Sequence, residues 1–80
     1  MYNVYVLIDN KGKLYKGLTN NISRRLSEHK AGHTITTAKM NDIRIVYTEI
    51  CNNFVEARKR ELYLKSAAGR RFLKKQLMRV

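Results

Sequence analysis

Residues that would point to a secreted or membrane protein are scarce in this 80-residue sequence. Cys51 is its one cysteine, which excludes a disulfide framework and a cysteine metal site. No apolar run approaches the length that spans a bilayer, and the short run over residues 4–8 follows no basic segment of a signal peptide. The chain also contains no proline, repeat, linker or low-complexity tract. These absences predict one cytoplasmic domain, residues 1–80, that does not contact a membrane.

Acidic residues are the next scarce class, because 6 Asp and Glu stand against 17 Lys and Arg. The resulting net charge of +11 is extreme for this length and attracts polyanions, of which nucleic acid is the first to consider. Taken alone, the charge also fits a ribosomal protein or attraction to an anionic membrane surface. The scarcity of acids leaves few side chains that can bind a cation.

Three short segments have the composition of β-strands. Residues 2–8 are rich in Val, Ile and Tyr, and the turn residues after them predict a hairpin that returns over residues 14–19. Residues 43–50 predict a third strand. Side chains alternate along strands, so Tyr15 and Gly17 share one face of the returning strand. A glycine inside a strand marks either a weak position or the close approach of another group to the backbone.

Helix signals follow these strands. Asn20 or Asn21 can cap a first helix that ends near residue 30. Asn53, with a glutamate three residues later, begins a second helix. Residues 69–80 predict a last helix with an apolar stripe formed by Leu73, Leu77 and Val80.

The order strand, strand, helix, strand, helix, helix predicts an α+β fold. We expect a small three-stranded antiparallel sheet flanked by helices, with the third strand beside the first. Residues 33–42 show no clear period and predict a loop. There, His33, Lys39 and the threonine hydroxyls either contact phosphate or belong to an ordinary polar loop.

Polar residues gather where the second strand meets the first helix. Arg25 and His29 are four residues apart and therefore lie on a common helical face, close in sequence to Tyr15. Arg24 lies about 100° around the helix, where Glu28 can pair with it. A structural protein has little need for such a concentration of polar chemistry, so the segment predicts a functional site.

Glu61 departs from its local pattern. In the second helix, positions spaced by three and four residues form one stripe, which reads Phe54, Ala57, Glu61, Leu64 and Ala68. A carboxylate on a buried stripe is destabilising unless it is paired or binds a cation. It can therefore pair with Lys65 at i+4, or bind a hard cation such as Mg²⁺. The acids at solvated or capping positions are Glu28, Glu49 and Glu56.

Taken in order, Tyr5, Tyr15, Arg25, His29 and Glu61 resemble the GIY-YIG nuclease domain. The resemblance covers residues 2–75 and is closest to compact, stand-alone members related to the nuclease module of excision-repair endonucleases. It is most specific over residues 19–29 and 56–65. Asn-Val-Tyr at 3–5 replaces Gly-Ile-Tyr, and Tyr-Lys-Gly at 15–17 replaces Tyr-Ile-Gly. Many members carry an Asn after the glutamate, and residues 62–80 contain none.

This resemblance implies a divalent-metal-dependent DNA endonuclease that uses one Mg²⁺ or Mn²⁺. Glu61 would hold the cation against a phosphate oxygen and the leaving oxygen. Arg25 would donate to the phosphate as it gains charge. Tyr5 would take the proton of the attacking water, with its pKa lowered from about 10 by Arg25, Lys16 and the metal. Tyr15 and His29 would orient the water and Tyr5, or share the proton transfer.

The expected partner is DNA, bound by a monomer or weak dimer. The residues expected to bind it are Lys16, Gly17, Lys39, Lys65, Arg70, Arg71, Lys74 and Lys75. A catalytically silent nucleic-acid-binding module of the same fold is the alternative, and a small RNA-packing protein is a third interpretation. Neither has a need for Glu61, because a carboxylate repels phosphate.

Overall fold

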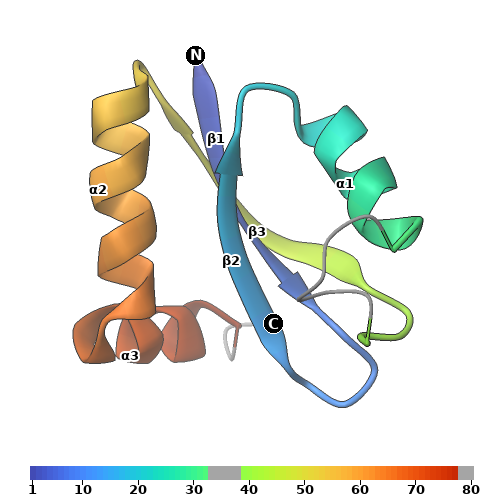
Figure 1. Cartoon of the computed structure of the whole chain (residues 1–80). Helices are drawn as coiled ribbons and strands as arrows, with labels where there is room; N and C mark the ends of the chain where they lie inside the picture. The colour runs from blue at the N-terminus through green and yellow to red at the C-terminus, as the bar shows by residue number, and fades with distance from the viewer. Residues whose placement is uncertain (33–38, 78–80) are drawn as a thin grey trace.

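The protein has the predicted order of elements. The structure is a computed structural model that describes residues 1–32 and 39–77. The elements are β1 (Tyr2–Ile8), β2 (Leu14–Thr19), α1 (Ile22–Lys30), β3 (Arg44–Cys51), α2 (Phe54–Lys65) and α3 (Ala67–Leu77) (Figure 1). The predicted α+β class is therefore confirmed.

One antiparallel sheet carries the strands in the order β2-β1-β3. The third strand lies beside the first, as expected, and β2 forms one edge. In the register of the sheet, Tyr5 of the central strand lies between Gly17 of β2 and Thr48 of β3. A register shift in the pairing with β3 follows Val6. This register places Tyr5, one of the two tyrosines of β1, opposite the one glycine of β2.

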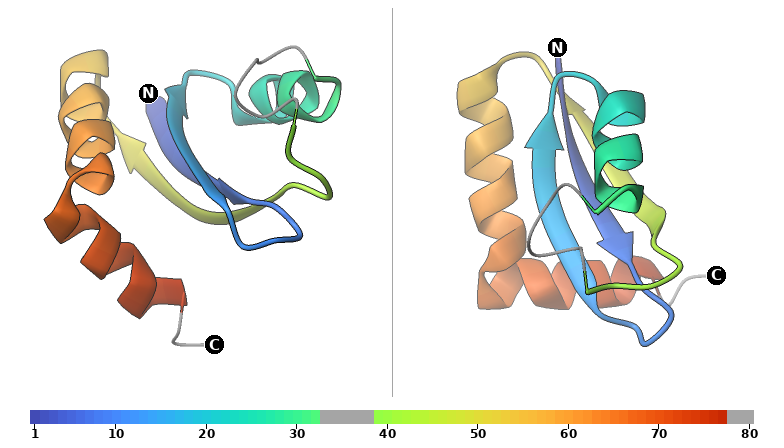
Figure 2. Two further views of the ribbon diagram at one scale, coloured as in Figure 1. Left: turned by 60° about the horizontal axis from the view of Figure 1, so that its bottom comes forward. Right: turned by 45° about the vertical axis from the view of Figure 1, so that its right-hand side comes forward.

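Helices cover both faces of the sheet. Figure 2 shows α1 on one face and α2 with α3 on the other. The fully buried core on the α2 side consists of Val4, Val6, Ala57, Leu64 and Leu73. The core on the α1 side consists of Tyr5, Leu7, Met40 and Ile43. Because β1 alternates between the two cores, each of its side chains belongs to one helical layer only.

Asparagine side chains begin two of the helices. Asn21, rather than Asn20, caps α1, with its Oδ1 accepting the backbone N–H of Arg24 at 3.0 Å. Asn53 caps α2 in the same way, accepting from the backbone N–H of Glu56 at 2.9 Å. The Glu56 carboxylate accepts in return from the backbone N–H of Asn52. These caps satisfy N–H groups that have no partner within the helix.

The last helix begins at Ala67, two residues before the predicted start. Ser66 ends α2 and caps α3, because its Oγ accepts from the backbone N–H of Gly69 at 3.2 Å. Gly69 lies buried inside α3, where a Cβ would overlap the backbone of Tyr63 and Leu64. The glycine therefore permits close packing of α3 on α2 and does not mark a helix boundary.

The predicted stripe of α2 is shorter than expected. Ala57, Glu61 and Leu64 are buried, whereas Phe54 is 51% exposed and packs edge-on against Tyr2. Ala68 is also exposed, because α2 ends before it. The stripe therefore contributes two apolar residues to the core, and Glu61 lies between them.

Some expectations fall on residues that the structure does not describe. His33 and the loop threonines lie within 33–38, and Val80 lies within 78–80, so their predicted roles are outside the described residues. Within 1–32 and 39–77, none of the helices is long and apolar enough to cross a membrane.

Candidate active site

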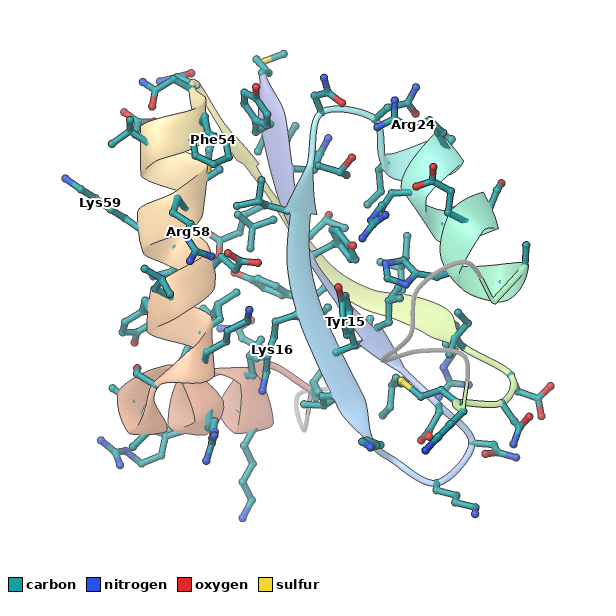
Figure 3. All side chains as sticks on the ribbon, in the orientation of Figure 1. Tyr15, Lys16, Arg24, Phe54, Arg58 and Lys59 are labelled. Carbon is teal, nitrogen blue, oxygen red and sulfur yellow. The ribbon has the colours of Figure 1, made fainter. Side chains whose placement is uncertain are left out.

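Strand β2 divides the candidate site into two halves. Tyr15 and Gly17 face α1, while Lys16 between them faces α2 and α3. Figure 3 shows the Tyr15 and Lys16 side chains on opposite sides of the β2 ribbon. We refer to Tyr5, Tyr15, Arg25 and His29 as the α1 half. The α2 half consists of Glu61, its two cationic partners Arg58 and Lys65, and the nearby cations Lys16 and Arg70, of which Lys16 is within electrostatic reach of Lys65 and Arg70.

The absence of a side chain at Gly17 makes room for the Tyr5 phenol. A Cβ at this position would lie 2.6 Å from the Tyr5 hydroxyl and 2.8 Å from its Cζ, closer than real Cβ contacts allow. The same Cβ would also press on the Tyr15 ring at 3.2 Å. Of the two interpretations of a glycine within this strand, close approach of another group is therefore correct.

Three rings meet beneath α1. The Tyr5 hydroxyl lies 2.8 Å from Nε2 of His29 in a buried hydrogen bond, with donor and acceptor set by the imidazole tautomer. The Tyr15 ring lies edge-on to His29, with 4.8 Å between ring centroids. Tyr5 and His29 are almost fully buried. Strands β1 and β2 and helix α1 thus position one phenol-imidazole pair and a second tyrosine.

Burial sets the protonation of this pair, and it does so against expectation at Tyr5. A decrease in the Tyr5 pKa was predicted from Arg25, Lys16 and the metal together, whereas the protein's own groups act in the opposite direction: burial raises the pKa from 10.0 to about 12, and the neighbouring Arg25 opposes that rise. Burial also lowers the pKa of His29, and the positive charge of Arg25 lowers it further. Both groups are therefore driven toward their neutral forms near neutral pH.

Arg25 is the charged member of the α1 half. Contact with the Tyr5 phenol, and then with Glu28, raises the pKa of Arg25, and Tyr15 contributes in the same direction. Its Nη1 donates to the Glu28 carboxylate at 3.1 Å, whereas Arg24 reaches Glu28 only at 4.0 Å. The predicted pairing of Arg24 with Glu28 is thus the weaker of two. Arg25 remains 33% exposed, so it can meet a solvent-borne anion.

Glu61 brings a buried carboxylate to the other side of β2. Its side chain is 9% exposed. Oε1 accepts from Nη1 of Arg58 at 2.5 Å, and Oε2 lies 3.5 Å from Nζ of Lys65. The predicted pairing with Lys65 is therefore present, beside a closer contact with Arg58. The negative charge of Glu61 also contributes to the rise in the Tyr5 pKa, so the two halves are within electrostatic reach of each other.

Arg58 is the residue that sequence reasoning missed. Figure 3 shows its side chain pointing from α2 toward the sheet, while that of the neighbouring Lys59 points away. Its position three residues before Glu61 places the two on one helical face, and this spacing was a usable signal.

The predicted DNA-binding residues separate into groups. Burial lowers the pKa of Lys16, and the positive charges of Arg70 and Lys65 lower it further, so Lys16 is within electrostatic reach of both. Lys74 shares the helical face of Arg70, at i+4. Lys39 is exposed, next to the buried Met40 of the α1-side core.

Arg71 and Lys75 lie elsewhere on α3. With Tyr63, Ala68 and Phe72 they line a separate shallow pocket of ≈ 270 Å³. This pocket shares none of its lining residues with either half of the site. Hence Arg71 and Lys75, like Lys39, are not gathered with Lys16, Lys65 and Arg70.

The residues present fit a divalent cation held partly by a substrate. The described residues contain no group of three or more His, Cys, Asp or Glu able to hold a metal ion. Mg²⁺ commonly keeps several waters and takes one or two carboxylates together with substrate phosphates. Glu61 supplies one such carboxylate beside a group of cations that attracts phosphate. A closed metal cage would require more acids than these halves contain.

Comparison with known proteins gives matches over most of the chain. A family model described as the GIY-YIG catalytic domain matches residues 1–75. A UPF0213 protein of Desulfotalea psychrophila is 37% identical over 70 residues, which are 85% of this chain and 64% of that protein. A UPF0213 protein of Clostridium perfringens is 36% identical over 63 residues, 78% of this chain and 68% of its own. The chain thus spans about two thirds of the length of these relatives.

The solved structures include a similar fold. The solution NMR structure of a UPF0213 protein from Bacillus halodurans matches with a TM-score of 0.58 and 28% identity, covering 94% of this chain and 84% of the other. Domains of the GIY-YIG type are typically nucleases, which use a divalent metal and act on nucleic acid. With the family model covering almost the whole described sequence, this chain belongs to the GIY-YIG catalytic domain family.

Proposed function

We propose that the chain is a divalent-metal-dependent endonuclease that hydrolyses phosphodiester bonds in DNA. The observation that carries this proposal is the buried Tyr5–His29 hydrogen bond beneath Gly17, with Arg25 beside it and Glu61 across β2. Proton transfer, oxyanion stabilisation and cation binding are the three tasks of phosphodiester hydrolysis. Strands β1 and β2 and helix α1 carry the groups suited to proton transfer and oxyanion stabilisation, and α2 carries the carboxylate, which is within electrostatic reach of Tyr5.

The proton route involves Tyr5 and His29 together. A phenol whose pKa is about 12 stays protonated at neutral pH and cannot act as a base alone. His29, held neutral by burial, offers Nε2 as an acceptor 2.8 Å from the phenol oxygen when its proton is on Nδ1. Tyr5 can then pass its proton to His29 as it takes one from the attacking water. In this proposal Tyr5 relays a proton, and the Tyr15 ring fixes the plane of the imidazole.

Arg25 and Glu61 would stabilise the negative charge that develops on the phosphate and the leaving oxygen. Arg25 donates to the phosphate, where its planar fork suits two oxygens as negative charge grows during attack. To do so it exchanges Glu28 for the phosphate, both being partners of the same kind. Glu61 would hold the divalent cation, which supplies neutralisation of the phosphate and of the leaving oxygen when bound.

The experiment is nicking of supercoiled plasmid with and without Mg²⁺, by the wild-type chain, Glu61→Gln and Glu56→Gln. Glu56 serves as the matched control, because it lies on the same helix and the substitution removes the same charge. We expect Glu61→Gln to reduce nicking by about 10²-fold or more and Glu56→Gln to leave it near wild type. Activity that persists in EDTA, or equal nicking by the two variants, would contradict the proposal.

A catalytically silent nucleic-acid-binding module is the second candidate. It is favoured by one observation, that Glu61 is already paired with two cations and so has a structural explanation. This candidate predicts DNA binding without nicking by the wild-type chain. It also predicts lower thermal stability for Glu61→Gln, with DNA affinity retained.

A further inference from the structure

The two buried acids of the chain are stabilised in different ways. Asp9 and Glu61 are the buried ones. The Asp9 carboxylate accepts from the backbone N–H groups of Lys11 and Lys13, which are fixed parts of the hairpin turn. The Glu61 carboxylate is instead paired with the ends of two long side chains, Arg58 and Lys65. The positive charges that compensate Glu61 are therefore removable, whereas the hydrogen bonds that stabilise Asp9 are built into the fold.

The two cations differ from Glu61 in how far their side chains are exposed to solvent. The Arg58 and Lys65 side chains are 51% and 48% exposed, whereas that of Glu61 is 9% exposed. Either cation can turn to water or to another anion at little cost, since it would remain solvated. Glu61 cannot be left without a positive charge, because an unpaired buried carboxylate is strongly destabilising. Whatever removes the two cations must be accompanied by a replacement.

The surroundings favour their removal by phosphate. Lys16, Lys65 and Arg70 lie close enough together to lower the pKa of Lys16. Arg58 and Lys65 contact the Glu61 carboxylate, and Lys16 is within electrostatic reach of Lys65 and Arg70, so the α2 half holds four cations and one carboxylate. This excess of positive charge attracts a polyanion, and two phosphates on adjacent nucleotides would offer Arg58 and Lys65 alternative partners.

We propose that Arg58 and Lys65 block Glu61 against divalent cations in the free chain, and that nucleic-acid phosphates release it by binding these two residues. Each Glu61 oxygen has its own cationic partner, so a metal ion that approaches either oxygen meets a positive charge already held there. Metal and nucleic acid then bind with positive coupling, and the coupling is reciprocal. This inference rests on the proposed role of Glu61 as the cation ligand. It adds Arg58 as a phosphate-binding residue that controls when the metal site is available.

The test measures Mn²⁺ binding to the chain without nucleic acid, by electron paramagnetic resonance of the free ion. Arg58→Gln is compared with Lys59→Gln, because both remove one positive charge from adjacent positions of α2 and only Arg58 points toward the sheet (Figure 3). We expect Arg58→Gln to bind Mn²⁺ at least about fivefold more tightly than wild type, and the double variant with Lys65→Gln more tightly still. Lys59→Gln should remain close to wild type. Equal affinities for Arg58→Gln and Lys59→Gln would overturn the inference.

A second arm adds a short duplex in a Tyr5→Phe background, which prevents turnover. Glu61→Gln in the same background gives the Mn²⁺ bound by DNA alone. After this subtraction, the duplex should raise Mn²⁺ affinity in the parent and raise it less in Arg58→Gln. An equal increase in both would also overturn the inference.

Failure of the inference is distinguishable from failure of the proposed function. If Glu61→Gln binds Mn²⁺ as tightly as its parent, the cation is not held by Glu61, and both proposals fail. If Glu61→Gln loses Mn²⁺ and Arg58→Gln gains nothing, only the blocking role of Arg58 is wrong. Circular dichroism and thermal unfolding of each variant show that the comparison concerns folded chains.

Discussion

The two halves of the site treat charge in opposite ways. In the α1 half, Tyr5 and His29 are buried and hydrogen bonded, and burial moves the pKa of each toward its neutral form. In the α2 half, the Glu61 carboxylate is paired with Arg58 and Lys65, which are about half exposed. A single strand separates a dry, neutral cluster from a wet, charged one.

The difference follows from what each half has to do. Proton transfer between two groups benefits from fixed geometry and from neutral ground states, which burial provides. Binding a polyanion and a cation needs charges that can exchange partners, and exposure permits that exchange. Gly17 is the point where the halves meet, because it lets the Tyr5 hydroxyl approach the backbone of the dividing strand.

Arg25 is the exception to this division, a charged residue in the neutral half, and its removal should have the largest effect. We expect Arg25→Ala to slow single-turnover cleavage by about 10²-fold or more, because its donors meet charge that develops during attack. Its loss should barely change DNA affinity, since it is one of 17 basic residues. Arg25→Lys should recover little, because an ammonium lacks the bidentate fork.

Arg24→Ala is the control for this prediction. Arg24 also pairs with Glu28, but at 4.0 Å and with a more exposed side chain. The measurement uses saturating enzyme, with DNA affinity determined separately. Equal damage from Arg24→Ala, or wild-type cleavage by Arg25→Ala once DNA is bound, would remove the proposed role of Arg25.

Gly17→Ala tests whether the α1 half can be damaged without the α2 half. The added methyl group would collide with the Tyr5 hydroxyl and Cζ, so we expect a loss of about 1–3 kcal/mol in the free energy of unfolding by urea. Mn²⁺ binding at Glu61 should be unchanged. Combining it with Tyr5→Phe removes the nearest colliding atom, so the double variant should lose less than the sum of the two single losses. Fully additive losses would place the strain elsewhere.

Two pairs of cations on α3 test how far the DNA-binding surface of the α2 half extends. Arg70 lies near Lys16 and shares a helical face with Lys74, whereas Arg71 and Lys75 line the separate pocket. The plot of log K for DNA binding against log salt has a negative slope. Replacing Arg70 and Lys74 by Gln should make this slope shallower by roughly 1.8, because each phosphate that is no longer neutralised on duplex DNA accounts for about 0.9. The same change at Arg71 and Lys75 should alter it by less. Identical slopes for the two variants would mean that α3 presents no preferred face to DNA.

The smallest expected effect is the pH dependence caused by His29. Burial, together with Arg25, lowers its pKa below the usual 6.5, and Glu28 opposes this in part, with the neutral Tyr5 and Tyr15 rings beside it. The unfolded chain therefore takes up this proton at a higher pH than the folded one. The stability contributed by His29 is complete above about pH 6.5 and is lost as the pH falls through the lower folded value. Urea unfolding between about pH 7.5 and 5 should show this loss, and His29→Gln should reduce it. An unchanged pH profile in the variant would assign the loss to other groups.

Much of the fold was accessible from the sequence because its signals are local. Asn21 and Asn53 cap their helices by side chains that act within three residues, and the alternation of β1 follows from strand geometry. The convergence of Tyr5, Tyr15, Arg25 and His29 also followed from short spacings together with a family resemblance. Ser66 was missed because a serine cap looks like any surface serine until the following helix is placed against α2.

The predictions that failed were mainly those that depend on contacts between different helices and strands. The effect of the protein's own groups on the Tyr5 pKa was misjudged, because neighbouring cations can be counted in a sequence, whereas burial beneath Gly17 and α1 cannot. The stripe of α2 was overestimated because Phe54 lies at the rim of the sheet and packs against Tyr2. Arg58 is a different case, because it pairs with Glu61 within α2 and the three-residue spacing was readable, but many other basic residues stand beside it in the sequence.

The position of β2 at the edge of the sheet has a consequence for self-association. An edge strand presents unpaired N–H and C=O groups, which can template pairing with the same strand of another copy. Here Lys16 lies on that strand, and Lys11 and Lys13 lie in the turn that precedes it, so two copies approaching edge to edge would bring like charges together. Among the described residues no strand pairs with the outer edge of β2, and the repulsion between these lysines opposes strand-to-strand pairing there. Salt screens this repulsion between lysines. Concentrated protein should therefore remain monomeric more readily at low salt than at high salt.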